Sequence, residues 1–277
     1  MGDDTACLVC LLLAGKYIAE HVDSPQWREI RREDAPGLLL VCNAGEEGLG
    51  NLKGVHKICE DFGDRIERFC TFDSSLSSIV DRAVGSKRFR VRVRTRGGHS
   101  YDDFGNDNAI AGLASLVGKL YGIRVPEGGK TTYNVGMISG GTSVNTIAQE
   151  AEMLYEFRSD RRENLEYMER QFMEVFDRAK AEGMDVSFKV IGVRPCEGQV
   201  DPKRKQALSD WAHRVVEEMT GQAPKHCAGS TDCNIPLSLG IPSVCVGSFR
   251  GAGAHTREEY VETDSLEEGY KVAFGMI

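Results

Sequence analysis

The spacing of apolar and polar residues changes near residue 85, and the patterns before and after that point predict two different kinds of domain. Before that point, apolar runs alternate with amphipathic segments. Residues 5–22 and 51–63 predict helices, and the first is apolar on most sides, so we expect it to be buried. Residues 37–45 (GLLLVCNAG) predict a central parallel strand, and residues 67–73 predict another strand. This order indicates an α/β domain, in which ligands collect at the carboxyl ends of the strands.

From residue 86 the pattern alternates strictly, as in a half-buried antiparallel strand. One face of this strand carries Phe89, Val91 and Val93, and the other carries Arg88, Arg90, Arg92, Arg94 and Arg96. The segments that follow complete the order βαββαβ of a ferredoxin-like unit. They are a helix over 106–123, strands over 131–139 and 150–160, a helix over 161–183 and a strand over 184–193.

Helix–strand alternation returns after Pro195. A helix is predicted to begin at Asp201 and Pro202, a good cap and first-turn pair, and residues 241–248 predict a buried strand. The fold class predicted is therefore α/β, with a mixed, largely parallel sheet flanked by helices and a ferredoxin-like βαββαβ domain inserted into it. The predicted boundaries are residues 1–85 with 197–277 for the larger domain and residues 86–196 for the inserted one.

Net charge, cysteine usage and the length of the first apolar run exclude several classes of protein. A formal net charge of −8 argues against a general binder of nucleic acid or anionic membranes, and we interpret the arginine-rich strand as a solvated or subunit-facing side. Nine cysteines in apolar stretches indicate reduced thiols; a zinc knuckle at Cys7 and Cys10 is the alternative for that pair. The first apolar run is too short to span a bilayer and follows Asp3 and Asp4 rather than basic residues. We expect a cytoplasmic protein.

Acidic or imidazole side chains stand in four turns beside predicted buried elements. Taken singly, they suit a helix cap, a solvated turn, a strand end and a surface histidine. Together they favour a metal site, because zinc binds carboxylate and imidazole ligands and a dication makes clustered carboxylates tolerable. Of two adjacent glutamates, one can bind metal while the other takes a proton from water. The residues are Asp3 and Asp4 in MGDDTA, Glu46 and Glu47 in GEEG, Asp73 in FDSS, and His255 in GAGAHTREEY.

Eight short segments occur in a collinear order around the inserted domain: GDDTA, GEEGLGNLKG, Asp73, RGGHS, GGTSVNTIA, EFRSD, STDCN and GAHTREEY. In this order the chain resembles the zinc-dependent aminoacylase and carboxypeptidase family of metallopeptidases. That family includes peptidase T, glutamate carboxypeptidase, acetylornithine deacetylase and succinyl-diaminopimelate desuccinylase. The resemblance is to its peptidase T-like branch, and GEEG and GGTSVN are the most specific segments.

The resemblance implies a role for each matching residue. Asp3 resembles the carboxylate that bridges two zincs, Glu47 and His255 resemble ligands of one zinc, and Asp73 resembles the terminal carboxylate of the other. Glu46 resembles the general base. His99 resembles the histidine that reaches from the inserted domain into a partner subunit's active site to stabilise the oxyanion. Asn145 resembles a residue that contacts substrate or oxyanion, and Arg158 one that binds the substrate carboxylate. A strand-end salt bridge is the alternative for Arg158, and a turn-stabilising role for His99.

The activity implied is hydrolysis of amide bonds in small peptides or N-acyl amino acids, by zinc-activated water with a glutamate general base. Cobalt or manganese would suit the same mixed ligands. The resemblance also implies a homodimer formed through the inserted domain, with no nucleic acid or membrane partner.

One family feature has no counterpart in the chain. The family's first zinc histidine lies in an H-x-D motif upstream of the bridging aspartate, here residue 3. The H-x-D of this chain, His21 to Asp23, is expected to lie a helix length away. We therefore expect a family member that lacks the N-terminal segment, binds at most one zinc well and hydrolyses poorly or not at all. A catalytically silent homodimeric fragment is the main alternative, and a two-metal phosphoesterase is a third hypothesis.

Overall fold

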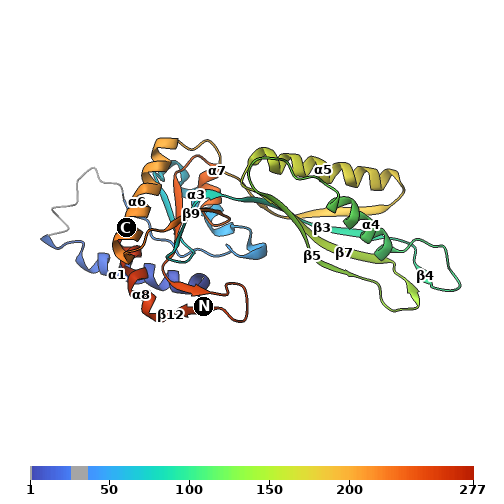
Figure 1. Ribbon diagram of the computed structural model, residues 1–277, viewed down its shortest axis with the longest axis horizontal. Coiled ribbons are helices and arrows are strands. Elements are labelled where there is room, and N and C mark those ends of the chain that lie inside the picture. Colours follow the sequence, from blue (N-terminus) through green and yellow to red (C-terminus); the bar gives the residue numbers. More distant parts are fainter. Residues whose placement is uncertain (1, 26–36) are drawn as a thin grey trace. The chain divides into compact units, whose positions relative to one another are not determined.

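The computed structural model describes residues 2–25 and 37–277, except the side chains of residues 2 and 3. The chain forms two compact units (Figure 1). Unit 1 consists of Met1–Ala83 and Gly198–Ile277, and unit 2 consists of Val84–Glu197. Among the described residues, no helix is both long enough and apolar enough to cross a membrane.

Unit 1 is built on a four-stranded mixed sheet in the order β1-β10-β2-β9. β10 runs parallel to β1 and antiparallel to β2, and β2 and β9 are parallel. The strands are β1 (Phe69–Phe72), β2 (Ser78–Ala83), β9 (Lys225–Gly229) and β10 (Ser243–Val246), and a separate hairpin joins β11 (Arg250–Ala252) to β12 (Tyr260–Glu262). The helices are η1 (Gly2–Ala6), α1 (Cys7–His21), η2 (Gly48–Gly50), α3 (Lys53–Phe62), η3 (Gly63–Arg65), α6 (Pro202–Thr220), α7 (Asn234–Ser238), η4 (Thr263–Ser265) and α8 (Leu266–Gly275).

Each face of this sheet is covered by helices and buries an apolar cluster. On one face, α6 and α8 pack against the sheet, and the cluster includes Ile79, Val244, Val246, Ala212, Val216 and Val272. The other face packs against residues around α7. Helix α6 begins as predicted, because the Asp201 carboxylate accepts hydrogen bonds from the backbone N–H groups of Lys203 and Arg204. It ends at Gly221, whose φ of 68° suits a glycine C-cap.

Two predictions for the first region are wrong. Residues 37–45 form no strand, and Leu38 and Leu39 are more than half exposed. A continuous apolar run becomes a strand only where neighbouring strands satisfy its backbone groups, and none of the described strands pairs with it. Helix α1 is also not buried on most sides: Cys7, Cys10 and Ala14 are buried, whereas Leu8, Val9, Leu12, Leu13 and Tyr17 are exposed.

Unit 2 has a four-stranded antiparallel sheet in the order β5-β7-β3-β8 with two helices on one face (Figure 1). Its order of main elements is the predicted βαββαβ, and the small strands β4 and β6 pair separately. The elements are β3 (Gly85–Arg94), β4 (Gly98–His99), α4 (Ala109–Tyr121), β5 (Thr131–Gly140), β6 (Thr146–Ile147), β7 (Glu150–Ser159), α5 (Arg162–Ala181) and β8 (Asp185–Arg194).

The alternation of β3 places apolar and charged residues on opposite faces, as predicted. Phe89 is buried and stacks on Phe172 of α5, with ring centroids 4.1 Å apart. On the opposite face, arginines of β3 pair with glutamates of β7; Arg88 lies 3.2 Å from Glu156. Burial opposes ionisation of Glu156, but its hydrogen bonds and charge pairing with arginines outweigh burial and lower the pKa of its carboxyl. The remaining pairs are Arg90–Glu152, Arg92–Glu150, Arg92–Glu152 and Arg94–Glu150.

All nine cysteines are thiols without a disulfide, as the sequence predicts. Burial is the main cause of the raised pKa values of the thiols that lie in the core or partly within it. It raises the pKa of Cys59 to about 11 and of Cys70 to about 12, and it raises those of Cys233 and Cys245 well above the usual range. Cys42, in contrast, is exposed. The thiols in the core of unit 1 therefore stay protonated at neutral pH.

We expect Phe172→Ala to lower the free energy of unfolding of unit 2 by about 3–5 kcal/mol, because it opens a cavity in a fully buried aromatic cluster. Met173→Ala is the matched control: Met173 is the next residue on α5 and is 37% exposed. Chemical denaturation of both variants checks this. Equal losses for the two variants would contradict the packing described.

We expect a thiol-alkylating reagent at pH 8 to modify Cys42 first and Cys233 and Cys245 last. Alkylation needs an accessible thiolate, and burial both shields these two thiols and raises their pKa values. In the native chain their reaction should be slower by about 10³-fold or more than in urea. Mass spectrometry of peptides after timed labelling measures each site. Labelling of Cys245 as fast as Cys42 in the native chain would show that this core is open.

Candidate active site

Asp73 lies at the carboxyl edge of the parallel pair β1 and β10, where strand-end ligands were predicted. The two strands end in step, with Phe72 opposite Val246. The backbone N–H of Asp73 donates to the carbonyl of Val246 at 3.2 Å, and the thiol of Cys245 donates to the carbonyl of Asp73 at 3.2 Å. The backbone of Asp73 is therefore fixed by the neighbouring strand.

The start of α1 lies against this same edge. The Cys7 thiol donates to the carbonyl of Ser74 at 3.9 Å, although the two are 67 residues apart. Burial raises the pKa of Cys7; hydrogen bonds to Ser248 and Ser74 oppose this, and the charge of Asp73 adds to it. The turn Gly2–Ala6 leads directly into this contact, so the backbone of Asp3 lies about one turn before Cys7. The side chain of Asp3 is outside the described residues, so its metal-bridging role stays a prediction.

The segment with Glu46 and Glu47 forms a tight glycine loop. The N–H of Gly50 donates to Glu47 O at 2.8 Å, and the N–H of Gly54 donates to Ala44 O at 3.0 Å. A Cβ atom at Gly54 would lie 2.6 Å from Ala44 O, so glycine is required for this approach. Glu46 is half-buried and Glu47 exposed. Adjacent glutamates thus have different surroundings within one fixed loop.

A buried polar contact fastens this loop to the turn between β9 and α7. The Asn43 side-chain amide donates to Asp232 Oδ2 at 2.8 Å, and Asp232 is only 5% exposed. The turn itself is closed by the N–H of Thr231, which donates to Asn234 Oδ1 at 2.9 Å. No role was predicted for these residues, although STDCN was among the segments noted. The available signal was an acid among the small polar residues Ser230, Thr231 and Asn234, a composition typical of a turn.

His255 lies in the turn that joins β11 to β12. It is exposed, and its φ of 65° places it in the left-handed region, which costs energy for a residue with a side chain. The N–H of Thr256 donates to Gly253 O at 2.9 Å and closes the turn. The base of the hairpin is held by Arg250, whose guanidinium donates to both carboxylate oxygens of Glu268, at 2.5 and 3.0 Å. The hairpin base is firmly anchored, and His255 lies at its exposed end.

The described side chains form no group of three His, Cys, Asp or Glu residues placed to hold one metal ion. The donor types suit zinc, but the structure does not bring Glu47, Asp73 and His255 into a ligand group. These residues are carried by three segments that are fixed separately: a loop on α3, a strand end and a hairpin turn. The ligand roles of these residues stay predictions.

In unit 2 the structure brings His99 and Asn145 together. His99 of β4 is opposite Thr146 of β6, the residue after Asn145. The N–H of Ser100 donates to Asn145 O at 3.0 Å, and the His99 side chain is 49% exposed, with Nδ1 3.2 Å from Asp102 Oδ2. The His99 N–H donates to Asp103 Oδ2 at 2.7 Å. A small two-stranded arm, β4 with β6, thus carries His99 and Asn145, for which contacts with oxyanion or substrate were predicted, side by side.

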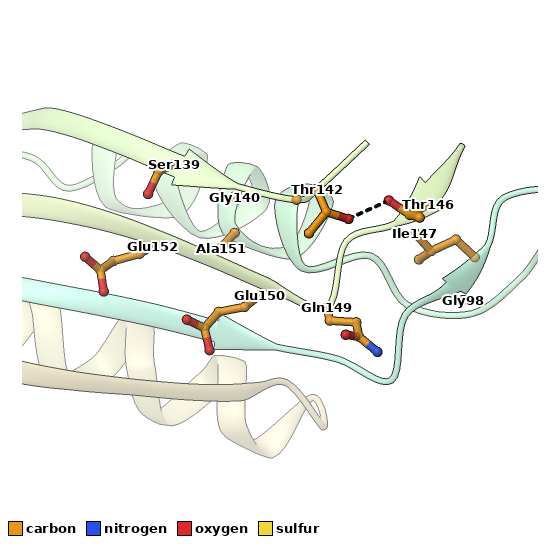
Figure 2. Close-up of a pocket in the computed structure, with 11 residues that line it drawn as sticks. Gly98, Ser139, Gly140, Thr142, Thr146, Ile147, Gln149, Glu150, Ala151 and Glu152 are labelled. Carbon is orange, nitrogen blue, oxygen red and sulfur yellow. Dashed lines mark hydrogen bonds between the residues drawn. The ribbon is translucent and has the colours of Figure 1, made fainter. Parts of the chain in front are cut away.

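A cavity of about 610 Å³ lies at the base of this arm, and Figure 2 shows its lining. Thr142 and Thr146 are hydrogen-bonded across it at 3.1 Å. The carboxylates of Glu150 and Glu152 lie along β7, where each already pairs with arginines of β3. The lining is therefore mixed, partly polar and partly apolar, and its two carboxylates are matched by neighbouring cations.

Arg158 is held within the open face of the unit 2 sheet. Its Nε and a terminal nitrogen donate to the two carboxylate oxygens of Glu156, at 2.8 and 3.1 Å. The side chain is 37% exposed. This is the salt bridge named as the alternative for Arg158, and a substrate carboxylate would have to compete with Glu156. The substrate-binding role stays a prediction.

Comparisons with known proteins agree with the motifs. The family model described as the peptidase dimerisation domain matches residues 83–184. A Haemophilus influenzae protein, named as a homolog of a p-aminobenzoyl-glutamate hydrolase subunit, is 35% identical over 194 residues, which are 67% of this chain and 44% of that protein. A probable carboxypeptidase of Arthroderma benhamiae is 27% identical over 170 residues, 54% of this chain and 32% of that one. The chain thus spans less than half the length of these relatives.

Solved structures show the same fold. The Bacillus cereus aminopeptidase PepT superposes with a TM-score of 0.71 at 22% identity, covering 100% of this chain and 70% of PepT. A Staphylococcus aureus tripeptidase gives a TM-score of 0.65 at 20% identity, covering 85% of this chain and 62% of that one. These likenesses confirm the predicted α/β fold class. Residues 83–184 match an M20 peptidase dimerisation domain, and the homologues and structural neighbours of the chain are M20 family peptidases and aminohydrolases, which confirms the resemblance predicted from the motifs.

Proposed function

We propose that this chain hydrolyses an amide bond in a small peptide or an N-acyl amino acid, as a peptidase T-like aminopeptidase or deacylase. The observation that carries the proposal is the 35% identity over 194 residues to the Haemophilus influenzae relative, which is named for a p-aminobenzoyl-glutamate hydrolase. The p-aminobenzoyl-glutamate linkage is an amide between an acyl group and an amino acid. The aminopeptidase and tripeptidase that share the fold are named for the same class of bond.

Glu46 is the general base in this proposal. It is half-buried in a loop that is fastened on one side by Gly54 and on the other by the Asn43–Asp232 contact. A carboxylate held in this way takes a proton from the attacking water and returns it to the leaving amine. The rigidity of the loop supports the role, because proton transfer depends on a fixed hydrogen-bond distance.

Zinc is the proposed cofactor, with Glu47 and His255 as ligands of one ion, Asp73 as a ligand of a second, incomplete site, and Asp3 shared between the two; cobalt and manganese are the alternatives. Carboxylate and imidazole donors suit all three metals. Bound zinc supplies positive charge that favours ionisation of water and stabilises developing negative charge. The support is the donor set and the place of Asp73 at the carboxyl edge of β1 and β10.

Unit 2 contributes the proposed lid and dimer contact. His99 donates to the oxyanion, Asn145 contacts substrate or oxyanion, and Arg158 binds a substrate carboxylate. The match of residues 83–184 to a dimerisation domain supports a homodimer through this unit, in which His99 serves the partner subunit's site. The exposure of His99 and its place beside Asn145 support the same role.

A second candidate is a homodimer that is silent as a catalyst. One observation favours it: the described side chains form no three-ligand metal group. Zinc content and a dipeptide hydrolysis assay on the purified chain separate the two candidates. Folded dimers with neither zinc nor turnover would establish the silent form.

We expect Glu46→Gln to lower the rate of hydrolysis by about 10²–10⁴-fold, because an amide cannot accept the proton of the attacking water. The control is Glu60→Gln on the neighbouring helix α3, where the side chain is exposed and lies 3.8 Å from Lys57. Initial rates with a dipeptide and with an N-acyl amino acid measure the effect. Unchanged turnover in the Glu46 variant would remove the assignment of the base.

We expect His99→Ala to lower turnover by about 10²–10³-fold without loss of zinc, as for an oxyanion donor. Because His99 would serve the partner's site, mixing His99→Ala with Glu46→Gln subunits should restore activity. With free exchange, half of the dimers are mixed and each has one intact site, so about a quarter of wild-type activity returns. Zinc loss in the His99 variant, or no recovery on mixing exchanged subunits, would contradict this role.

A further inference from the structure

Two histidines, an aspartate and a serine form a polar cluster in unit 1 that has no part in the proposed function. His226 lies on the edge strand β9, Asp81 on the adjacent strand β2, and His213 and Ser209 on α6. His226 Nδ1 is 2.6 Å from Asp81 Oδ2, and Ser209 Oγ donates to the same oxygen at 2.8 Å. His213 Nδ1 is 2.9 Å from His226 Nε2.

The fold aims these side chains at one another in two ways. Asp81 lies two residues after Ile79 and shares its face of the sheet, toward α6. The register shift between Val80 and Arg82 leaves Asp81 without an opposite residue on β9 and returns Ala83 to the other face, in the core with Val80. On α6, Ser209, His213 and Glu217 follow at intervals of four residues and therefore share one face. The bulge and the helical repeat bring the cluster together beside the apolar contact of α6 with the sheet.

The hydrogen bonds determine which ring nitrogens carry lone pairs. An ionised carboxylate only accepts, so the contact with Asp81 places the hydrogen of His226 on Nδ1 and the lone pair on Nε2. On the second ring, Nε2 of His213 is 3.8 Å from Glu217 Oε2, too far for a hydrogen bond, so only the contact with His226 bears on its Nδ1. The lone pair of His226 Nε2 points to an electropositive species between the two facing nitrogens, either the proton of His213 Nδ1 or a metal cation.

We propose that His213 Nδ1 and His226 Nε2 form an exchangeable site for a divalent transition-metal cation of the Zn²⁺, Ni²⁺ and Cu²⁺ class. Two imidazoles bound to a tetrahedral ion with ordinary bond lengths have ring centroids about 5.2 Å apart and nitrogens about 3.3 Å apart. Here the centroids are 5.1 Å apart and the ring planes nearly parallel, at 7°. The facing nitrogens, 2.9 Å apart, would have to separate by about 0.4 Å to admit the ion.

The surroundings of the two rings suit such a site. The other nitrogen of His226 is hydrogen-bonded to a carboxylate, the outer arrangement that orients metal-binding histidines, and the carboxylate of Glu217 lies 3.8 Å from the other nitrogen of His213. The side chains of His213 and His226 are 31% and 35% exposed, so an ion can enter and water can complete its coordination. The described residues supply no third His, Cys, Asp or Glu to this group, so we expect a weakly held, exchangeable ion rather than a permanent one. The bound ion would cross-link β9 to α6.

The test uses the full chain carrying Glu47→Gln, His255→Gln and Cys42→Ser. These changes remove two of the four proposed zinc ligands, including the only imidazole among them, and an exposed thiol. Zinc binding that depends on His213 or His226 in this background is therefore separate from the proposed hydrolytic site. Calorimetric titration with Zn²⁺ should show one site per chain. Adding His213→Gln or His226→Gln should abolish it, and adding Asp81→Asn should weaken it by about 10–100-fold. His21→Gln, on the exposed end of α1, is the control and should leave binding unchanged.

Nuclear magnetic resonance of the histidine rings gives a second readout that needs no variant in the cluster. In the triple-variant background, equimolar Zn²⁺ should shift the ring signals of His213 and His226 and leave those of His21 in place. Circular dichroism verifies that every variant is folded. Unshifted rings at saturating Zn²⁺, or a stoichiometry that survives loss of either histidine in a folded chain, would overturn the proposal. The pair would then be an N–H···N hydrogen bond only.

Discussion

The parallel pairing of β1 with β10 is the contact on which the candidate site depends. It joins two parts of the chain that the whole of unit 2 separates; Asp73 and Cys245, in contact at this edge, are 172 residues apart. Closing so long a loop is entropically costly, and the burial of Val244, Cys245 and Val246 on the two faces of the sheet offsets that cost. Only after this pairing do the Asp73 strand end, the start of α1 and the β11–β12 hairpin belong to one unit.

Unit 2 could be predicted from its sequence because each element satisfies its own pattern locally. The alternation around Phe89 placed β3 correctly, and the amphipathic repeat placed α5 to within two residues at each end. Unit 1 was harder for a physical reason. The run at residues 37–45 has the composition of a buried strand, but composition does not supply the neighbour that a strand needs. Strands β2 and β9 were missed because polar residues such as Asp81 and His226 interrupt their apolar pattern.

Some parts of the candidate site could likewise be predicted from the sequence, and others could not. The position of Asp73 and the pairing of His99 with Asn145 follow from strand ends and a short arm, which sequence patterns indicate well. A metal-ligand group instead depends on side-chain directions in separately held segments, and a motif does not encode those directions. Arg158 illustrates the limit: its guanidinium is bound by Glu156, two residues earlier on the same face of one strand. Side chains alternate between the faces of a strand every second residue, and this alternation predicts the contact with Glu156 as readily as a contact with substrate.

The arginine–glutamate ladder on the open face of unit 2 has a consequence for how this unit reaches a single structure. Along β3 and β7, every second residue is apolar and faces the core, and most of the residues between them are charged and face the open side of the sheet. A slip of one residue would carry the guanidinium groups of Arg88, Arg90 and Arg92 into the aromatic cluster and expose Phe89. Mispaired arrangements are therefore penalised from both faces at once. The charges thus help to select one register, and this selection extends along the two strands at the centre of the sheet.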